Sequence, residues 1–534
     1  MQNNISNSQL NNQPFPLTLL LSSDAYINDG NKPIGRRSAG SSFLDAYLQY
    51  SRNDLHSLVT PTSNENEWFQ EKARTINSNT SIKTIGLRNW GLAARETGTF
   101  HFPDPHMEHW AWRRMVYGDG SISLLGIMHT LSGNGIQKGL SELSSAPIRP
   151  WDALICTSTA GKKVVEGFLE RQENFLRWRH GASRFERPQL PIIPLGIDPS
   201  LWTTAENPKL RRQRCRKELN LPIDSSLVLV AGRLDFFTKF QPDPLLRVLE
   251  CLRKTSQPNL ELVIYGEAHN DIQLEQWKIG AKQLAPSVPI HWFPGKNRDI
   301  SAALRWASDI FVSLADNPQE TFGITPLEAM AAGLPCLVSD WDGYRDTVVQ
   351  AGESDEPTGI RIPTRMVQGL GIPESISCVN GVLGDRLAIG LLSQGIAVDQ
   401  ECLRKGLNQL LDDEALRETL GQAGQRRVNR LYDWKVVIEQ WRELIQHLTE
   451  RREKAQQAGL TLKPQLPPCR PSISAAFGCF ATEVLDRDWN PPAPSPEVEA
   501  DRLDNPFQEW DQTLLSTEGP RRRGWWLKQG LVKP

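Results

Sequence analysis

Two glutamates, Glu320 and Glu328, stand eight residues apart in the segment ETFGITPLEAMAAGLPCLVSD. A carboxylate can accept paired hydrogen bonds from neighbouring hydroxyl groups, as in a ribose or a hexose. Each glutamate also has a simpler interpretation. Thr-Pro-Leu-Glu fits a capping box in which Glu328 satisfies the N-cap amide of a helix, and Glu320 alone fits a solvated loop carboxylate.

The same segment predicts a helix whose N-terminus faces a ligand. Thr325 is a good N-cap, Pro326 suits the first helical position, and Gly333 with Pro335 would end the helix. Its free N–H groups and positive dipole end should lie at the C-terminal edge of a parallel sheet, where doubly wound folds bind ligands. Such an end suits a diphosphate, and Gly323 would let the backbone come close to it.

Two cations are expected at the same edge of that sheet. Arg233 and Lys239 lie in AGRLDFFTKF, the loop that follows the predicted strand SLVLVA. Two cations beside a helix N-terminus would neutralise a diphosphate leaving group. A lone Arg and Lys are more often solvated, so the functional interpretation depends on both signals falling at one edge.

These segments resemble family 4 glycosyltransferases, which are retaining, metal-independent enzymes of GT-B fold. The family's Glu-x7-Glu motif matches Glu320 to Glu328, and SDWDGYRDTV, from Ser339, is similar to a branch of the family. The resemblance covers roughly residues 15–450 and is strongest over 190–350. The family's diphosphate-binding glycine, arginine and lysine match Gly232, Arg233 and Lys239.

The resemblance implies a role for each matched residue. Glu320 would contact the hydroxyls of the transferred sugar and Glu328 the ribose. The family often has Gly after the diphosphate lysine, where this chain has Phe240. Backbone amides would hold the diphosphate and the sugar, namely those of Gly323, Ile324 and Thr325.

The N-terminal half carries weaker signals. Gly35, Gly40 and Ser41 are expected in a loop after the first strand, where the family has a Gly-rich loop near the diphosphate and the acceptor; a loop without a ligand is equally compatible. His129, in SLLGIMHT, matches the histidine that relatives hold near the reacting sugar, although a lone histidine at a strand end is more often structural. Trp110, in HFPDPHMEHWAWRR, fits an acceptor-side loop or the core.

Strand-like and helix-like segments alternate for over 400 residues, which predicts an α/β fold. With the resemblance, we expect GT-B architecture, in which two Rossmann-like domains place parallel sheets across a cleft. The expected parts are a disordered N-terminus (1–14), an acceptor domain (15–203), a nucleotide-sugar domain (204–430), a crossing helix (431–454) and a Pro-rich, extended tail (455–534).

Composition excludes several other classes. A formal net charge of -2, from 60 basic and 62 acidic residues, gives no reason to expect nucleic-acid binding. Eight cysteines without a CxxC pair signal no zinc site and suit a reducing compartment. Asp340 with Asp342, and Asp486 with Asp488, imitate a DxD motif but lie outside its context, so no metal and no other cofactor is expected. With no apolar run long enough to span a bilayer, a cytoplasmic location is expected.

The C-terminal end combines cations with aromatic rings. Within residues 521–528, three arginines precede Trp525, Trp526 and Lys528. This pattern suits weak, peripheral contact with an anionic membrane at its inner face. The alternative is that the tryptophans pack on the protein's own surface.

The function expected from these residues is transfer of a sugar from a nucleotide-sugar donor, which is a substrate and not a cofactor. The reaction would be of the hexosyltransferase type, and the acceptor (a glycan, a lipid-linked or a small molecule) is left open. A non-catalytic nucleotide-sugar-binding scaffold and a sugar phosphorylase are the alternatives. The expected catalytic residues are Glu320, His129, Arg233 and Lys239.

Overall fold

The computed structural model describes residues 16–27, 35–53, 55–76, 81–295, 297, 300–369 and 383–485. The chain divides into two units, residues 1–465 and 466–534. The predictions made for residues 1–14 and 521–528 lie outside the described residues.

The first half of the chain forms a parallel six-stranded sheet in the order β3-β2-β1-β4-β5-β6. Central strands such as β5 are buried along their whole length, because helices cover both faces of a parallel sheet. The strands are β1 (Thr18–Leu20), β2 (Leu55–Thr60), β3 (Ser81–Gly86), β4 (Thr99–His101), β5 (Ser123–Ile127) and β6 (Ala153–Ile155). The helices are α2 (Ser23–Tyr26), α3 (Gly35–Tyr50), α4 (Ser63–Ile76), α5 (Trp90–Thr97), α6 (Met107–Arg114), α7 (Asn134–Glu142) and α8 (Thr159–His180).

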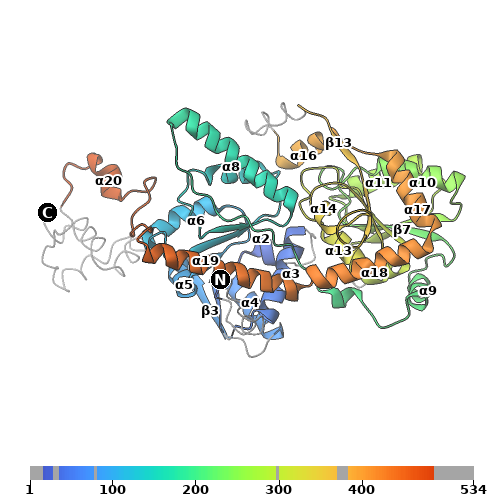
Figure 1. The fold of residues 1–534 in the computed structure, drawn as a ribbon, viewed down its shortest axis with the longest axis horizontal. Coiled ribbons are helices and arrows are strands. Elements are labelled where there is room, and N and C mark those ends of the chain that lie inside the picture. The colour runs from blue at the N-terminus through green and yellow to red at the C-terminus, as the bar shows by residue number, and fades with distance from the viewer. Residues whose placement is uncertain are drawn as a thin grey trace, which may run out of the picture. The chain divides into compact units, whose positions relative to one another are not determined.

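A second parallel sheet follows in the order β12-β11-β10-β7-β8-β9. Its strands are β7 (Ser226–Ala231), β8 (Leu260–Gly266), β9 (Ile290–Pro294), β10 (Ile310–Ser313), β11 (Cys336–Ser339) and β12 (Gly359–Ile362). Its helices are α9 (Pro208–Glu218), α10 (Asp243–Thr255), α11 (Asp271–Leu284), α12 (Ser301–Ala307), α13 (Ile324–Ala331), α14 (Tyr344–Thr347), α17 (Gln400–Asp412) and α18 (Glu414–Leu431). Strands β13 (Thr364–Met366) and β14 (Ile396–Val398) form a short antiparallel pair, and α16 (Asp385–Ser393) lies between them in the sequence. The predicted α/β fold with two Rossmann-like sheets is confirmed (Figure 1).

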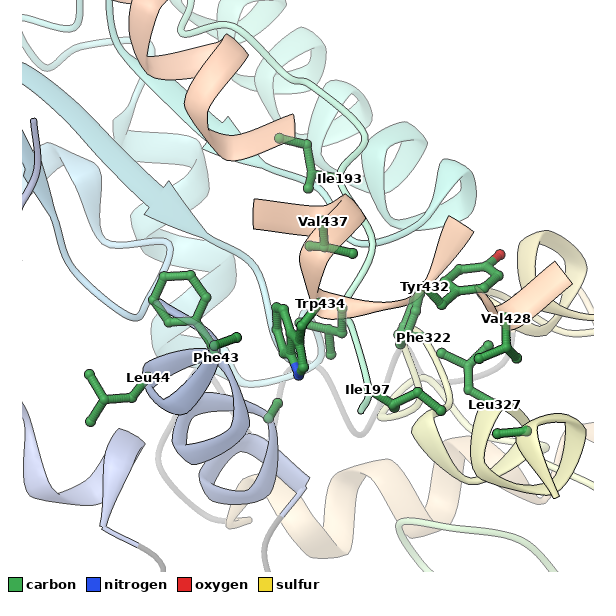
Figure 2. Packing of buried hydrophobic residues seen from close by; sticks show 14 of the residues in the cluster. Phe43, Leu44, Ile193, Ile197, Phe322, Leu327, Val428, Tyr432, Trp434 and Val437 are labelled. Atoms are coloured by element: carbon green, nitrogen blue, oxygen red, sulfur yellow. The ribbon is translucent and has the colours of Figure 1, made fainter. Parts of the chain in front are cut away.

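Helix α19 (Trp434–Gln457) follows the second sheet in sequence but packs on α3 of the first half. The indole Nε1 of Trp434 donates to Ser42 Oγ at 2.6 Å, and the rings of Trp441 and Phe43 lie 4.4 Å apart. Figure 2 shows this packing continuing past Trp434 to Phe322 and Leu327 of the second half. One hydrophobic cluster is therefore shared by both halves of the chain.

Asp152 fixes the last strands of the first sheet. Its buried carboxylate pairs with the buried guanidinium of Arg114 and accepts from the amides of Leu124 at 2.9 Å and Arg149 at 2.8 Å. Ser158, just after β6, caps α8 by accepting from the Gly161 amide at 3.0 Å. These two residues therefore position chain segments at the end of the first sheet.

In the second unit, the described residues contain α20 (Ile473–Phe477) and a 3-10 turn, η4 (Gly478–Phe480). Within the described ranges, no helix has both the length and the apolar character needed to cross a membrane.

Candidate functional site

The start of α13 lies at the C-terminal edge of the second sheet, as predicted, but one cap is placed differently. Gly323 is the N-cap, not Thr325, and Thr325 lies inside the first turn. Gly323 has φ +93°, and a Cβ there would lie 2.2 Å from Cε1 of Tyr344. A glycine is therefore required both by the left-handed backbone and by the close approach of the tyrosine ring.

The predicted cation Lys239 meets the predicted acid Glu320 directly. Their side chains form an ion pair, in which 12% of the Lys239 side chain and 15% of the Glu320 side chain are exposed. Lys239 Nζ also lies 3.5 Å from the hydroxyl of Tyr344, which is hydrogen-bonded to Ser313 Oγ at 2.7 Å. Three loops of one sheet edge, after β7, β10 and β11, thus converge on this cation.

Burial and pairing act in opposite directions on this ion pair. Burial alone would raise the pKa of Glu320, but the charges of Lys239 and Arg233 outweigh it and lower that pKa. Burial likewise opposes the charge of Lys239, but Glu320 raises the Lys239 pKa above its ordinary value. The stability that Glu320 contributes is therefore fully present above its ordinary pKa of 4.5 and is lost as the pH falls through its lower folded pKa. The stability that Lys239 contributes is present below its ordinary pKa of 10.5 and is lost only as the pH rises through its higher folded pKa.

Arg233 is the second predicted cation, and its Nη1 donates to Thr238 Oγ1 at 3.2 Å. Phe240, which stands where the family often has glycine, is 3% exposed. Its ring contacts Trp277 edge-on at 5.8 Å. The phenylalanine therefore anchors in the core the end of the loop that carries Arg233 and Lys239, residues 232–240, which we call the cation loop.

Glu328 does not cap the helix, so the capping-box interpretation is wrong. The N-cap of α13 has no side-chain hydrogen bond, and the Glu328 carboxylate pairs with the guanidinium of Arg305 on α12. Arg305 is 1% exposed and stacks on Trp202 at 4.6 Å. Burial raises the pKa of Glu328 more than Arg305 lowers it, so the charge of this carboxylate carries a desolvation cost in the ligand-free protein.

His129 lies just after β5, at the carboxyl edge of the first sheet. Its carbonyl oxygen accepts a hydrogen bond from Thr321 Oγ1 of the second half, and Ser132 Oγ donates to Gln319 at 3.1 Å. The edges of the two sheets therefore face each other, as GT-B architecture requires. Burial lowers the pKa of the His129 imidazole to about 3, helped by the charge of Arg36, so the ring is neutral at physiological pH.

The predicted glycine-rich loop is a helix. Gly35, Gly40 and Ser41 all lie in α3, which begins at Gly35. A Cβ at Gly40 would lie 2.2 Å from the carbonyl oxygen of Ala25. Gly40 is therefore a packing residue between α3 and α2, and the loop prediction is wrong for all three positions.

Trp110 is also a structural residue. Trp110 is 5% exposed on α6, edge-on to Trp90 at 5.0 Å. The acceptor-side interpretation of this tryptophan is therefore wrong. Among the described residues, no group of three or more His, Cys, Asp or Glu side chains could hold a metal ion.

Sequence reasoning missed Tyr344 and Arg305. Tyr344 stands inside the noted motif SDWDGYRDTV, which was the available signal. Arg305 stands in ISAALRWA, where a single cation in an otherwise apolar helix gives no functional signal. Only the packing of α12 against the site assigns it to Glu328.

Residues 211–370 match the family model of the glycosyl transferases group 1. The D-inositol 3-phosphate glycosyltransferase of Xylanimonas cellulosilytica is 25% identical over 295 residues, 55% of this chain and 58% of that protein. The phosphatidyl-myo-inositol mannosyltransferase of Mycobacterium leprae is 24% identical over 70% of this chain and 79% of its own length. The match spans only 58% of the length of the Xylanimonas enzyme, and only 39% of the length of the glycogen synthase of Bordetella petrii.

Solved structures share the fold at low identity. HepE of Anabaena, solved with UDP and glucose, has a TM-score of 0.51 and 14% identity, covering 82% of this chain and 99% of that one. A glycosyltransferase from Rickettsia africae has a TM-score of 0.53 and 12% identity, covering 81% and 97%. The architecture is that of the GT-B proteins. Within that class, the matched segment and the named relatives support a glycosyltransferase of group 1.

The tight contact between Gly323 and Tyr344 can be tested by comparing two glycines that have the same φ. Gly323 and Gly352 both have φ +93°, but a Cβ at Gly352 meets nothing within 4 Å. We expect Gly352→Ala to lower the unfolding free energy by about 1–2 kcal/mol, the cost of a left-handed alanine. Gly323→Ala should cost about 1–3 kcal/mol more, because its methyl group overlaps Tyr344. Urea unfolding measures both, and equal losses would contradict the tight contact with the tyrosine.

Proposed function

We propose that this chain is a retaining, metal-independent glycosyltransferase of family 4, which transfers a hexose from a nucleoside diphosphate sugar. The observation that carries the proposal is the convergence of Lys239, Arg233, Glu320 and the free N-terminus of α13 at one sheet edge. A cationic, water-poor site beside a helix N-terminus binds phosphate groups well.

In the proposed complex, Arg233, Lys239 and the amides of the first turn of α13 hold the diphosphate. Thr325 Oγ1 is buried without a hydrogen-bond partner in the described structure, which favours a ligand oxygen as its partner. Glu320 would accept hydrogen bonds from the sugar hydroxyls, and Glu328 from the ribose. Ligand contacts of Gly35 and Ser41 in α3 stay predictions.

The proposed reaction breaks the bond between the anomeric carbon and the β-phosphate oxygen and forms a bond to an acceptor hydroxyl oxygen on the same face. The acceptor proton passes to the departing diphosphate. Arg233 and Lys239 stabilise the charge that develops on that group. The neutral imidazole of His129 is suited to hydrogen-bond a sugar hydroxyl without adding charge.

The solved complex of HepE contains UDP, which makes UDP-sugars the first donors to try. The acceptor stays open, because the names of the relatives cover a cyclitol phosphate, a phosphatidylinositol and a glycogen chain. A cytoplasmic location belongs to the proposal and is supported by free cysteines among the described residues.

Donor binding should depend on Arg233. Thermal shifts with UDP, GDP and ADP, and with their sugars, would first identify the donor. Arg233→Ala should then weaken nucleoside diphosphate binding by roughly 10- to 150-fold, because a charge-assisted hydrogen bond contributes about 1.5–3 kcal/mol. Arg247→Ala, which removes only an exposed pair with Asp243, is the matched control. Equal affinities for the two variants would refute the assignment of Arg233.

The product should retain the anomeric configuration of the donor. Nuclear magnetic resonance of the glycoside product measures this, with EDTA and added Mn²⁺ as separate arms. An inverted anomer, or EDTA-abolished activity that Mn²⁺ restores, would contradict the proposal. Phosphate-dependent cleavage without nucleotide would identify a phosphorylase, and donor binding without any transfer would identify a scaffold.

Peripheral membrane contact is proposed for residues 521–528, which lie outside the described part of the chain. The longer segment 518–534 holds five basic residues, and at about 1 kcal/mol each they would give reversible, salt-sensitive attachment. We expect the full chain to sediment with anionic but not neutral liposomes, and a chain ending at Thr517 to stay in the supernatant. Equal behaviour of the two forms would remove the membrane contact.

A further inference from the structure

Helix α16 belongs to neither six-stranded sheet; in the sequence it lies between β13 and β14, the strands of the short pair. It nevertheless contacts the loop that carries Arg233 and Lys239. Its residue Arg386 reaches Asp235 in that loop, and the guanidinium lies over the ring of Phe237 at 4.6 Å. Neither the sequence motifs nor the proposed ligand contacts include this helix.

Asp235 organises the loop from inside. It is 4% exposed, and its Oδ1 accepts from the amides of Phe237 at 2.9 Å and Thr238 at 3.3 Å. Its carbonyl oxygen accepts from the Lys239 amide at 3.0 Å. The turn that presents Lys239 is therefore built on Asp235, and Thr238 in that turn also holds the Arg233 guanidinium.

Arg386 holds Asp235 at two points. Its Nε donates to Oδ2 at 3.2 Å and its Nη2 to Oδ1 at 3.1 Å. A forked pair of this kind fixes the orientation of a carboxylate as well as its charge. Burial alone would raise the pKa of Asp235, but Arg386 and the loop amides lower it, so the carboxylate is ionised when it accepts from the loop.

The contact between α16 and the loop is close along its length. A Cβ at Gly390, one turn after Arg386, would lie 2.0 Å from Cδ1 of Phe237. At its N-terminus, beside Arg386, α16 also meets the first half of the chain, where Asp385 accepts from the Asn134 amide at 3.1 Å. The helix is thus held both by the cation loop and by the start of α7.

We infer that Arg386 is a positioning residue for donor binding: through Asp235 it holds the turn that aims Lys239 and Arg233 at the diphosphate. The inference rests on the proposed function. Arg386 acts through Asp235 and Phe237, which it contacts directly. Its removal would leave a buried carboxylate without its counter-charge, and the loop would lose the rigidity on which its cations depend.

The first test is hydrogen–deuterium exchange of the full chain without ligand. In Arg386→Gln, the amides of Phe237, Thr238 and Lys239 should exchange at least tenfold faster than in the wild type, while β7 and β8 keep their protection. Arg386→Lys, which keeps the charge but not the fork, should lie between the two. Arg404→Gln, which loses an exposed pair within α17, is the control and should leave the loop unchanged. Wild-type exchange in Arg386→Gln would overturn the anchoring of the loop.

The second test measures affinity for the nucleoside diphosphate (UDP, GDP or ADP) that gives the wild type its largest thermal shift. We expect its Kd to rise 5- to 20-fold in Arg386→Gln, less in Arg386→Lys, and not at all in Arg404→Gln. Faster loop exchange with an unchanged Kd would overturn the positioning role and leave Arg386 a purely structural residue. If no nucleoside diphosphate binds the wild type, the proposed function fails and the positioning role falls with it, whereas the exchange result still reports on the anchoring alone. If Arg386→Gln does not fold, Arg386→Lys decides. We expect its loop amides to exchange faster and its Kd to be higher than in both the wild type and Arg404→Gln, and wild-type behaviour of Arg386→Lys would refute the inference.

Discussion

The ion pair between Lys239 and Glu320 is the interaction on which the site depends. It joins the loop after β7 to the loop before α13, and both side chains are largely removed from water. A buried charge without a partner is costly, so each residue needs the other in the ligand-free protein. The consequence is a cation held in place before any ligand arrives. A diphosphate entering here would meet an ammonium group that is already desolvated and oriented.

The buried ion pair depends on two neighbouring residues, a tyrosine and a glycine. Tyr344 fills the space beside the ion pair, and only a glycine at position 323 lets α13 begin against its ring. Burial raises the pKa of Tyr344 to about 12 despite the nearby Lys239, so its hydroxyl stays protonated and can donate or accept without adding charge. The helix N-terminus, the cation and the neutral hydroxyl are therefore fixed together.

The two halves of the chain are held by different kinds of contact. On the side of α19, a continuous apolar cluster runs from Phe43 through Trp434 to Leu327. At the facing sheet edges, the contacts are single hydrogen bonds, such as Thr321 to the His129 carbonyl and Ser158 to Asp342 at 3.1 Å. Apolar burial stabilises in proportion to area, whereas one polar contact contributes about 1 kcal/mol. The side around α19 is thus the more stable one, and the facing sheet edges are held by contacts that are individually weak.

The sequence by itself determined the fold class and the charged residues at the carboxyl edge of the second sheet. Alternating strands and helices, each a few residues to a few turns long, leave parallel sheets as the way to bury their apolar faces, and strand ends then place Arg233, Lys239 and Glu320 at a common edge. Local signals were less reliable where a competing contact exists. Thr325 and Glu328 form a good capping box in isolation, but Gly323 takes the cap and Arg305 takes the carboxylate. Gly40 and Trp110 fit a binding loop by type, yet their places are set by close packing against Ala25 and Trp90.

Only the tertiary structure decided which charges meet. The pairs Lys239–Glu320, Arg305–Glu328 and Arg386–Asp235 join residues 81, 23 and 151 positions apart. No periodicity or motif encodes such partners, because the pairing is a property of which loops the sheet order brings together. The sequence supplies the charges and the strands that carry them. The strand order and the packing of α12, α13 and α16 determine the distances between these charges. Those distances fix the pKa values and orientations of the groups at the carboxyl edge of the second sheet.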